Sequence, residues 1–150
     1  MNISELMSKE ALVIQDSIPV HRMAQLFAKH EITGAPVINE HGKLVGVVSM
    51  SDLWRKRGGS DGKHDYYLNP SWGSVDLPDG HEETKVSDIM TNLIICADED
   101  DDIERAADLM VIHGIHRVVV TKDEKVVGVI TSTDLVREFR DRMKAAKQLR

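Results

Sequence analysis

The sequence contains a single cysteine, Cys96, and aromatic residues make up only 4% of it. A lone cysteine excludes a disulfide within the chain, and because Cys96 falls in a predicted strand we expect a buried, inert thiol. With so few aromatic rings, the core must be built from Val, Ile, Leu, Met and Ala. Long apolar runs are also missing, and the first residues lack the charged-then-apolar pattern of a signal peptide. We therefore expect a cytoplasmic protein with no membrane contact.

Acidic residues outnumber basic ones by 25 to 19, so the net charge is −6. This balance argues against general binding of nucleic acids, which needs a basic face. With 150 residues, 41% of them hydrophobic, the chain is long enough to form one soluble domain with its own core. Composition therefore excludes several function classes but does not indicate a particular one.

The sequence repeats itself once. Three stretches of the first half match three of the second: ISELM (3–7) and VSDIM (86–90), RMAQLFAKHEI (22–32) and RAADLMVIHGI (105–115), KLVGVVSMSDLWR (43–55) and KVVGVITSTDLVR (125–137). A tandem repeat of this size predicts two copies of one unit packed around a pseudo-two-fold axis. Ligand sites are then expected in related pairs at the seam between the copies.

Each copy alternates between strand and helix patterns. Residues 12–14 and 94–96 read as short strands, and each precedes a helix with an apolar stripe at helical spacing. Asp16 or Ser17 is expected to cap the first of these helices. Two strands and a tight turn follow (35–39 and 44–49; 118–121 and 126–131), and a second helix then starts at a Ser/Thr-rich step. The predicted fold is α+β, with tandem βαββα units.

Both copies close on glycine, two hydrophobic residues, Ser or Thr, two further residues and Asp: GVVSMSD (46–52) and GVITSTD (128–134). This pattern, in a tandem βαββα unit, resembles the CBS domain, and the whole chain looks like a stand-alone CBS pair, or Bateman module. The resemblance divides the chain into a first motif (1–57), an insertion (58–85) and a second motif with an extended C-terminal helix (86–150). It does not explain the insertion.

The closing motifs place polar groups at a helix N-terminus. Ser49 and Ser51 precede Asp52, and Thr131 and Thr133 precede Asp134 in the same way. Free N–H groups and hydroxyls at a helix start bind anions and polar ligands, and a carboxylate there can accept hydrogen bonds from a ribose diol. The alternative is purely structural: the hydroxyl caps the helix and the Asp complements its dipole.

The resemblance also implies an adenine slot lined by the backbone before the first strands and at the entry to the middle strands. Its residues are Ala11, Leu12, Thr33, Gly34, Ala35 and Pro36 in copy one, and Leu93, Ile94, Ile115, His116, Arg117 and Val118 in copy two. Arg117 and His116 would reach a ligand phosphate. Copy one has no charge at the equivalent Thr33-Gly34, so we expect unequal clefts. The alternative for His116 and Arg117 is a salt bridge between the copies.

Three other features of the sequence, an acidic run, an aromatic insertion and a basic C-terminal helix, can be explained without a ligand site. The acidic run at 98–102 is expected to cap the following helix rather than to hold a metal. Tyr66, Tyr67 and Trp72 in the insertion, with Trp54 at its edge, either fold back on the domain, contact a partner or a second subunit, or form a lid over a cleft. The C-terminal helix has an apolar face and a net charge of +4 from Arg137 onward. Basic residues suit the C-terminus of a helix; a dimer contact is the second interpretation, and a contact with nucleic acid or an acidic partner is the third.

No nucleophile–base pair, metal cluster or phosphate-binding loop is visible, so no enzyme activity and no catalytic cofactor are expected. The resemblance implies a regulatory module that senses AMP, ADP or ATP, with S-adenosylmethionine or NAD as alternatives. It would act as a homodimer and signal through a regulated partner protein. The main rival is a scaffold with vestigial clefts. A nucleotide-processing enzyme with Asp52 or Asp134 as base is the other alternative.

Overall fold

The computed structural model describes residues 1–55 and 84–150. Most of the predicted insertion, with Tyr66, Tyr67 and Trp72, lies outside the described residues, as does the side chain of Trp54. The chain forms two compact units. Unit 1 contains residues 1–11 and 95–150, and unit 2 contains residues 12–94.

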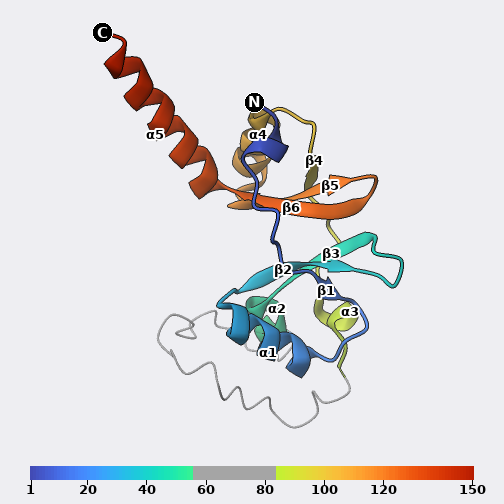
Figure 1. Cartoon of the computed structure of the whole chain (residues 1–150). Coiled ribbons are helices and arrows are strands. Elements are labelled where there is room, and N and C mark those ends of the chain that lie inside the picture. Colours follow the sequence, from blue (N-terminus) through green and yellow to red (C-terminus); the bar gives the residue numbers. More distant parts are fainter. Residues whose placement is uncertain (56–83) are drawn as a thin grey trace. The chain divides into compact units, whose positions relative to one another are not determined.

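Unit 2 is a three-stranded sheet whose helices lie on one face (Figure 1). The parallel pair β1–β2 and the antiparallel pair β2–β3 form the sheet, with β2 in the centre. Its elements are β1 (Ile14–Gln15), α1 (Val20–His30), β2 (Gly34–Ile38), β3 (Leu44–Ser49), α2 (Met50–Arg55) and α3 (Val86–Ile89). Aliphatic side chains, Met23 and Phe27 fill the space between α1 and the sheet, as the apolar stripe of this helix predicts.

Unit 1 repeats this plan. Its sheet has the order β4–β5–β6, with the same parallel and antiparallel pairs. Its elements are the 3-10 helix η1 (Ile3–Glu5), β4 (Cys96–Asp98), α4 (Ile103–His113), β5 (Arg117–Lys122), β6 (Lys125–Thr131) and α5 (Ser132–Gln148). Its core is again aliphatic, with Val118, Val120 and Ile130 fully buried. The α+β fold and the tandem βαββα order are therefore confirmed.

The two units do not coincide with the two copies of the sequence, because the leading segment of each copy packs in the unit of the other. Ser8 of copy one exchanges two backbone hydrogen bonds with Val129 of β6, at 2.9 and 3.0 Å. Thr91 of copy two does the same with Val47 of β3, at 3.0 and 2.9 Å. These bridges cover one edge strand in each sheet, which would otherwise present unpaired N–H and C=O groups.

Two details of the predicted elements were wrong. The first strand of each copy begins two residues later than predicted, because Ile14 and Cys96 are the first residues that pair with the middle strand, at Val37 and Val119. Neither Asp16 nor Ser17 caps α1: the N-cap residue is Pro19, which makes no side-chain capping bond. The expected turn of copy one is confirmed, with Gly42 at a positive φ of 76°.

Candidate functional site

The candidate site occurs twice, once in each unit, at the junction where the last strand turns into a helix. In unit 2 the backbone N–H of Met50 donates to the carbonyl of Thr33 at 2.9 Å. In unit 1 the N–H of Ser132 donates to the carbonyl of His116, also at 2.9 Å. Each bond ties the first residue of a helix to the residues that lead into the middle strand. Two segments that the sequence analysis assigned to one site are thus joined at each junction.

Asp52 is held by the junction of unit 2. Its Oδ2 atom accepts hydrogen bonds from the backbone N–H of Ser49 at 2.8 Å and from the Ser49 hydroxyl at 3.1 Å. The hydroxyls of Ser49 and Ser51 are 2.7 Å apart, so they form a hydrogen bond as well. Asp52 is only 7% exposed. The carboxylate is therefore fixed in one orientation and largely shielded from solvent.

Asp134 makes the matching contacts in unit 1 and completes a capping box. Its Oδ2 atom accepts from the Thr131 N–H at 2.8 Å and from the Thr131 hydroxyl at 2.7 Å. In return the Asp134 N–H donates to Thr131 Oγ1 at 3.2 Å. The other oxygen, Oδ1, lies 3.4 Å from Nη1 of Arg137. Asp134 is half-buried, so it is more accessible than the buried Asp52.

The remaining residues around the junctions differ in what they can offer a ligand. Thr33, His116 and Arg117 are exposed, whereas Ala35 and Val118 are buried in the cores. Because Ala35 and Val118 turn their side chains inward, only their backbone could contact a ligand, as could that of the buried Pro36. The half-buried Ile115 packs against the core of unit 1, and Thr133 is exposed on the first turn of α5.

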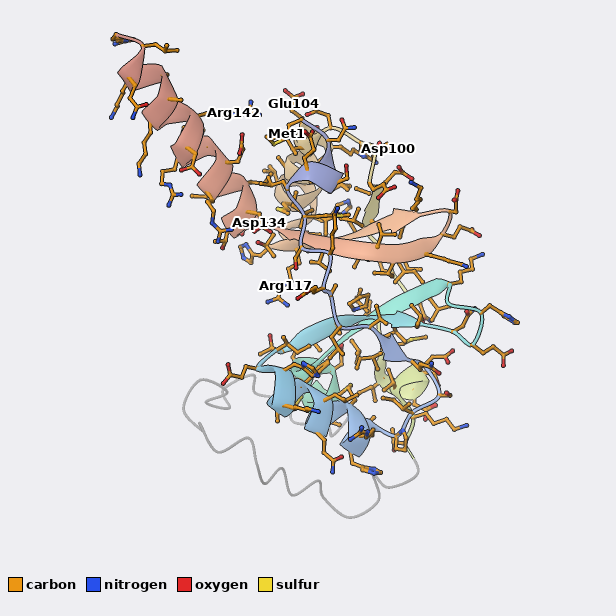
Figure 2. All side chains as sticks on the ribbon, viewed as in Figure 1. Met1, Asp100, Glu104, Arg117, Asp134 and Arg142 are labelled. Atoms are coloured by element: carbon orange, nitrogen blue, oxygen red, sulfur yellow. The ribbon has the colours of Figure 1, made fainter. Side chains whose placement is uncertain are left out.

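Arg117 lies beside the junction of unit 1. It pairs in register with Thr131 across β5 and β6, which places the start of β5 next to the start of α5. Figure 2 shows Arg117 and Asp134 at the same end of this sheet. In the part of the chain that the structure describes, Arg117 has no acidic partner. The corresponding position of copy one is Gly34, so unit 2 lacks this charge.

The other residues predicted for the adenine slot are among the first or last residues of the segments that make up the two units. Ala11 ends the first segment of unit 1, and Leu12 begins unit 2. Leu93 and Ile94 end unit 2 and are both exposed.

Sequence reasoning missed Arg137, which contacts the Asp134 carboxylate. The signal was present, because Asp-Leu-x-Arg closes both copies, with Asp52 and Arg55 in the first and Asp134 and Arg137 in the second. A spacing of three residues on a helix brings such a pair together.

In the acidic run at 98–102, Asp98, Asp101 and Asp102 accept hydrogen bonds from backbone N–H groups, and Glu99 pairs with Lys122. Asp102 is the N-cap of α4 and accepts a hydrogen bond from the Glu104 N–H at 3.0 Å, which lowers the pKa of Asp102. Among the described residues, no group of three or more His, Cys, Asp or Glu side chains could hold a metal ion. Nor is any helix of the described residues long and apolar enough to cross a membrane.

Comparison with known proteins decides the family. The family model of the CBS domain matches residues 3–53 and 86–141, which are the two copies of the repeat. The chain belongs to the CBS domain family. It is 33% identical to an uncharacterized protein of Methanocaldococcus jannaschii, a match covering 91% of this chain and 89% of that protein.

A second relative, the L-aspartate semialdehyde sulfurtransferase of Methanocaldococcus jannaschii, is 28% identical over 91% of this chain. The chain spans only 23% of that relative's length. Among solved structures, the fold matches a CBS domain pair in complex with 5′-methylthioadenosine and S-adenosyl-L-methionine. The TM-score is 0.70 at 26% identity, and the match covers 95% of this chain and 98% of that one. That CBS domain pair thus binds ligands that contain adenosine.

Proposed function

We propose that this CBS pair is a regulatory module that binds an adenine nucleotide, AMP, ADP or ATP, and transmits the ligand state to a partner protein without catalysis. The observation that carries the proposal is the junction of unit 1, where a fixed carboxylate, Asp134, and an exposed guanidinium, Arg117, lie at neighbouring starts of α5 and β5. A carboxylate suits a ribose diol and an Arg fork suits a phosphate. The adenosine ligands of the similar CBS pair support the same class.

The geometry of Asp134 favours sugar recognition. Its Oδ2 atom is occupied by two hydrogen bonds from Thr131, so the side chain is oriented before any ligand arrives. Within the part of the chain that the structure describes, its Oδ1 atom accepts a hydrogen bond only from Arg137, through one long bond of 3.4 Å. A ribose hydroxyl could share or replace that bond at small cost. Preorganisation of this kind reduces the entropy that binding would otherwise lose.

The two junctions are unequal, which supports one strong site for each chain. Asp134 is more accessible than Asp52. Copy two also has basic side chains beside its junction, His116 and Arg117, where copy one has Thr33 and Gly34. The terminal phosphate of AMP, ADP or ATP carries more negative charge than the carboxylate of S-adenosylmethionine or the bridging phosphates of NAD, so it gains more from Arg117. We therefore place AMP, ADP and ATP ahead of S-adenosylmethionine and NAD. Transmission to a partner requires that the ligand bind two arrangements of the module with different affinity. We also propose that the working form is a homodimer.

A scaffold with vestigial sites is the second candidate, and one observation favours it. Both Asp side chains already accept bonds from their own junction, so helix capping alone explains why Ser or Thr and Asp occur three residues apart. On this alternative the junctions stabilise the fold and bind nothing.

Isothermal titration of the ligand-stripped protein with AMP, ATP, S-adenosylmethionine and NAD tests the proposal. We expect micromolar binding of AMP or ATP, which corresponds to about −8 kcal/mol, with one strong site in each chain. Incubation of the bound nucleotide with the protein, followed by chromatography, should recover it unchanged, since no catalysis is proposed. Absence of binding to all four ligands would favour the scaffold.

A further inference from the structure

Among the described residues, α5 carries three ion pairs, and the pair of Arg137 with Asp134 is the longest of them. Nη1 of Arg137 lies 3.4 Å from Oδ1 of Asp134. The pairs that Arg140 and Arg142 make with acidic neighbours on the same helix are 2.8 and 2.7 Å long. A hydrogen bond of 3.4 Å is weak, and 57% of the Arg137 side chain is exposed. Arg137 can therefore leave the carboxylate at little cost.

Arg137 is not needed to hold the Asp134 side chain in place. The Oδ2 atom of Asp134 accepts two shorter hydrogen bonds from Thr131, at 2.8 Å from its N–H group and 2.7 Å from its hydroxyl. These bonds belong to the capping box, in which Arg137 takes no part. No residue of α5 is buried, so the core does not depend on Arg137 either. What Arg137 brings to the junction is its positive charge.

The proposed ligand makes this charge important. A carboxylate that binds the ribose diol of a nucleotide also repels the phosphate group of the same nucleotide, because both are negative and only a sugar separates them. A cation beside the carboxylate offsets that repulsion. The junction of unit 1 has two exposed cations, Arg117 and Arg137, beside one carboxylate, so positive charge is in excess. Without Arg137, the charges of Arg117 and Asp134 would cancel.

The two arginines differ in what they face. Within the described part of the chain, Arg117 has no acidic partner, so its guanidinium is available for direct contact with a phosphate. The guanidinium of Arg137 instead faces the carboxylate that would bind the sugar. Its effect on a phosphate is therefore exerted through space, by reducing the negative charge at Asp134.

We infer that Arg137 determines the preference of unit 1 for nucleotides with a phosphate over uncharged nucleosides, by offsetting the charge of Asp134. This inference rests on the proposed function and adds a specificity-determining residue to its site. A nucleoside gains nothing from the offset, and its ribose competes with Arg137 for Oδ1 of Asp134. Arg137 therefore favours AMP and ATP and disfavours adenosine.

Titration of Arg137→Gln with adenosine, AMP and ATP tests the inference. Glutamine keeps an N–H donor but removes the charge, so AMP should bind about threefold more weakly or worse. ATP should lose more than AMP, and adenosine should bind at least as tightly as it does to the wild type. Arg137→Lys keeps the charge and should bind AMP within about twofold of the wild type. Arg140→Gln, which removes a similarly exposed charge one turn along α5, should leave the ratio of AMP to adenosine affinity unchanged.

The same titrations in about 0.5 M salt should bring AMP binding by Arg137→Gln closer to that of the wild type, since salt screens exposed charges. Equal weakening of AMP and adenosine by Arg137→Gln would overturn the inference, because a purely structural role predicts it. Unchanged AMP binding, or Arg137→Lys as weak as Arg137→Gln, would overturn it as well. Each of these results leaves the sensor intact. A folded wild-type chain that binds neither adenosine nor a nucleotide refutes the sensor and this inference together.

Discussion

The backbone of Gly128 packs directly on Ser8: a Cβ atom built on Gly128 would lie 2.6 Å from the carbonyl oxygen of Ser8. The same contact occurs in unit 2, where a Cβ on Gly46 would lie 2.7 Å from the carbonyl oxygen of Thr91. Real side chains do not approach a carbonyl so closely. These glycines of the closing motifs therefore let the leading segment of each copy pair with the edge strand of its unit.

Gly128→Ala and Gly46→Ala should each destabilise the protein by about 1–3 kcal/mol, the usual cost of overpacking a close contact. Chemical denaturation followed by circular dichroism measures this. Gly34→Ala is the matched control, because its Cβ would meet nothing closer than the Val48 carbonyl, at 3.4 Å. Equal destabilisation by all three substitutions would show that the close approach to a carbonyl oxygen does not account for the effect.

Asp134→Asn and Thr131→Ala separate ligand recognition from helix capping. Thr131→Ala removes the capping hydroxyl and should cost about 1 kcal/mol of stability, yet it keeps the carboxylate. Asp134→Asn keeps the size of the side chain and should lower AMP affinity about tenfold or more, because a charged acceptor is lost. Thermal unfolding and titration with AMP provide the two readouts.

The equivalent substitution in unit 2, Asp52→Asn, serves as the control for the position. Asp52 is more shielded than Asp134, so its replacement should change AMP affinity less. An Asp134→Asn variant that binds AMP as the wild type does would refute the assignment of Asp134 to the ribose.

Arg117→Ala should weaken AMP binding about tenfold while leaving adenosine within about twofold, since only AMP offers the guanidinium a phosphate. Stability should hardly change, because Arg117 is exposed and no ion pair holds it within residues 1–55 and 84–150. Arg105→Ala, another exposed arginine of unit 1, controls for the general loss of positive charge. If AMP and adenosine weaken equally, Arg117 supports the fold of the site and does not read the phosphate.

The repeat, the order of elements and the Ser/Thr-x-x-Asp junctions were predictable because each rests on spacing along the chain. The sequence could not predict in which unit each leading segment packs. Residues 3–7 and 86–90 are so alike that either could pack in either unit. The first residue of each first strand was also not predictable, because the local sequence does not mark it. Residues 12–14 are uniformly apolar, and only the pairing of Ile14 with Val37 shows where the strand begins. A helix-capping Asp and a ribose-binding Asp would lie at the same spacing from the Ser or Thr, so the sequence alone could not separate capping from ligand binding at Asp134.

Helices α1 and α4 end differently at equivalent positions, which allows a reciprocal test of stability. Both C-cap residues adopt the left-handed conformation, Glu31 with φ 53° and Gly114 with φ 62°. Glycine adopts this conformation freely, whereas a side chain costs about 1–2 kcal/mol there. Glu31→Gly should therefore stabilise the protein by about 1 kcal/mol, and Gly114→Ala should destabilise it by a similar amount.

Equilibrium denaturation of both single variants and of the double variant measures these effects. A Cβ on Gly114 would meet no atom within 4 Å, so Gly114→Ala reports backbone conformation without steric clash. The two positions belong to different units, so their effects should add in the double variant. A loss of stability in Glu31→Gly would mean that contacts of the Glu31 side chain outweigh the strain of its backbone.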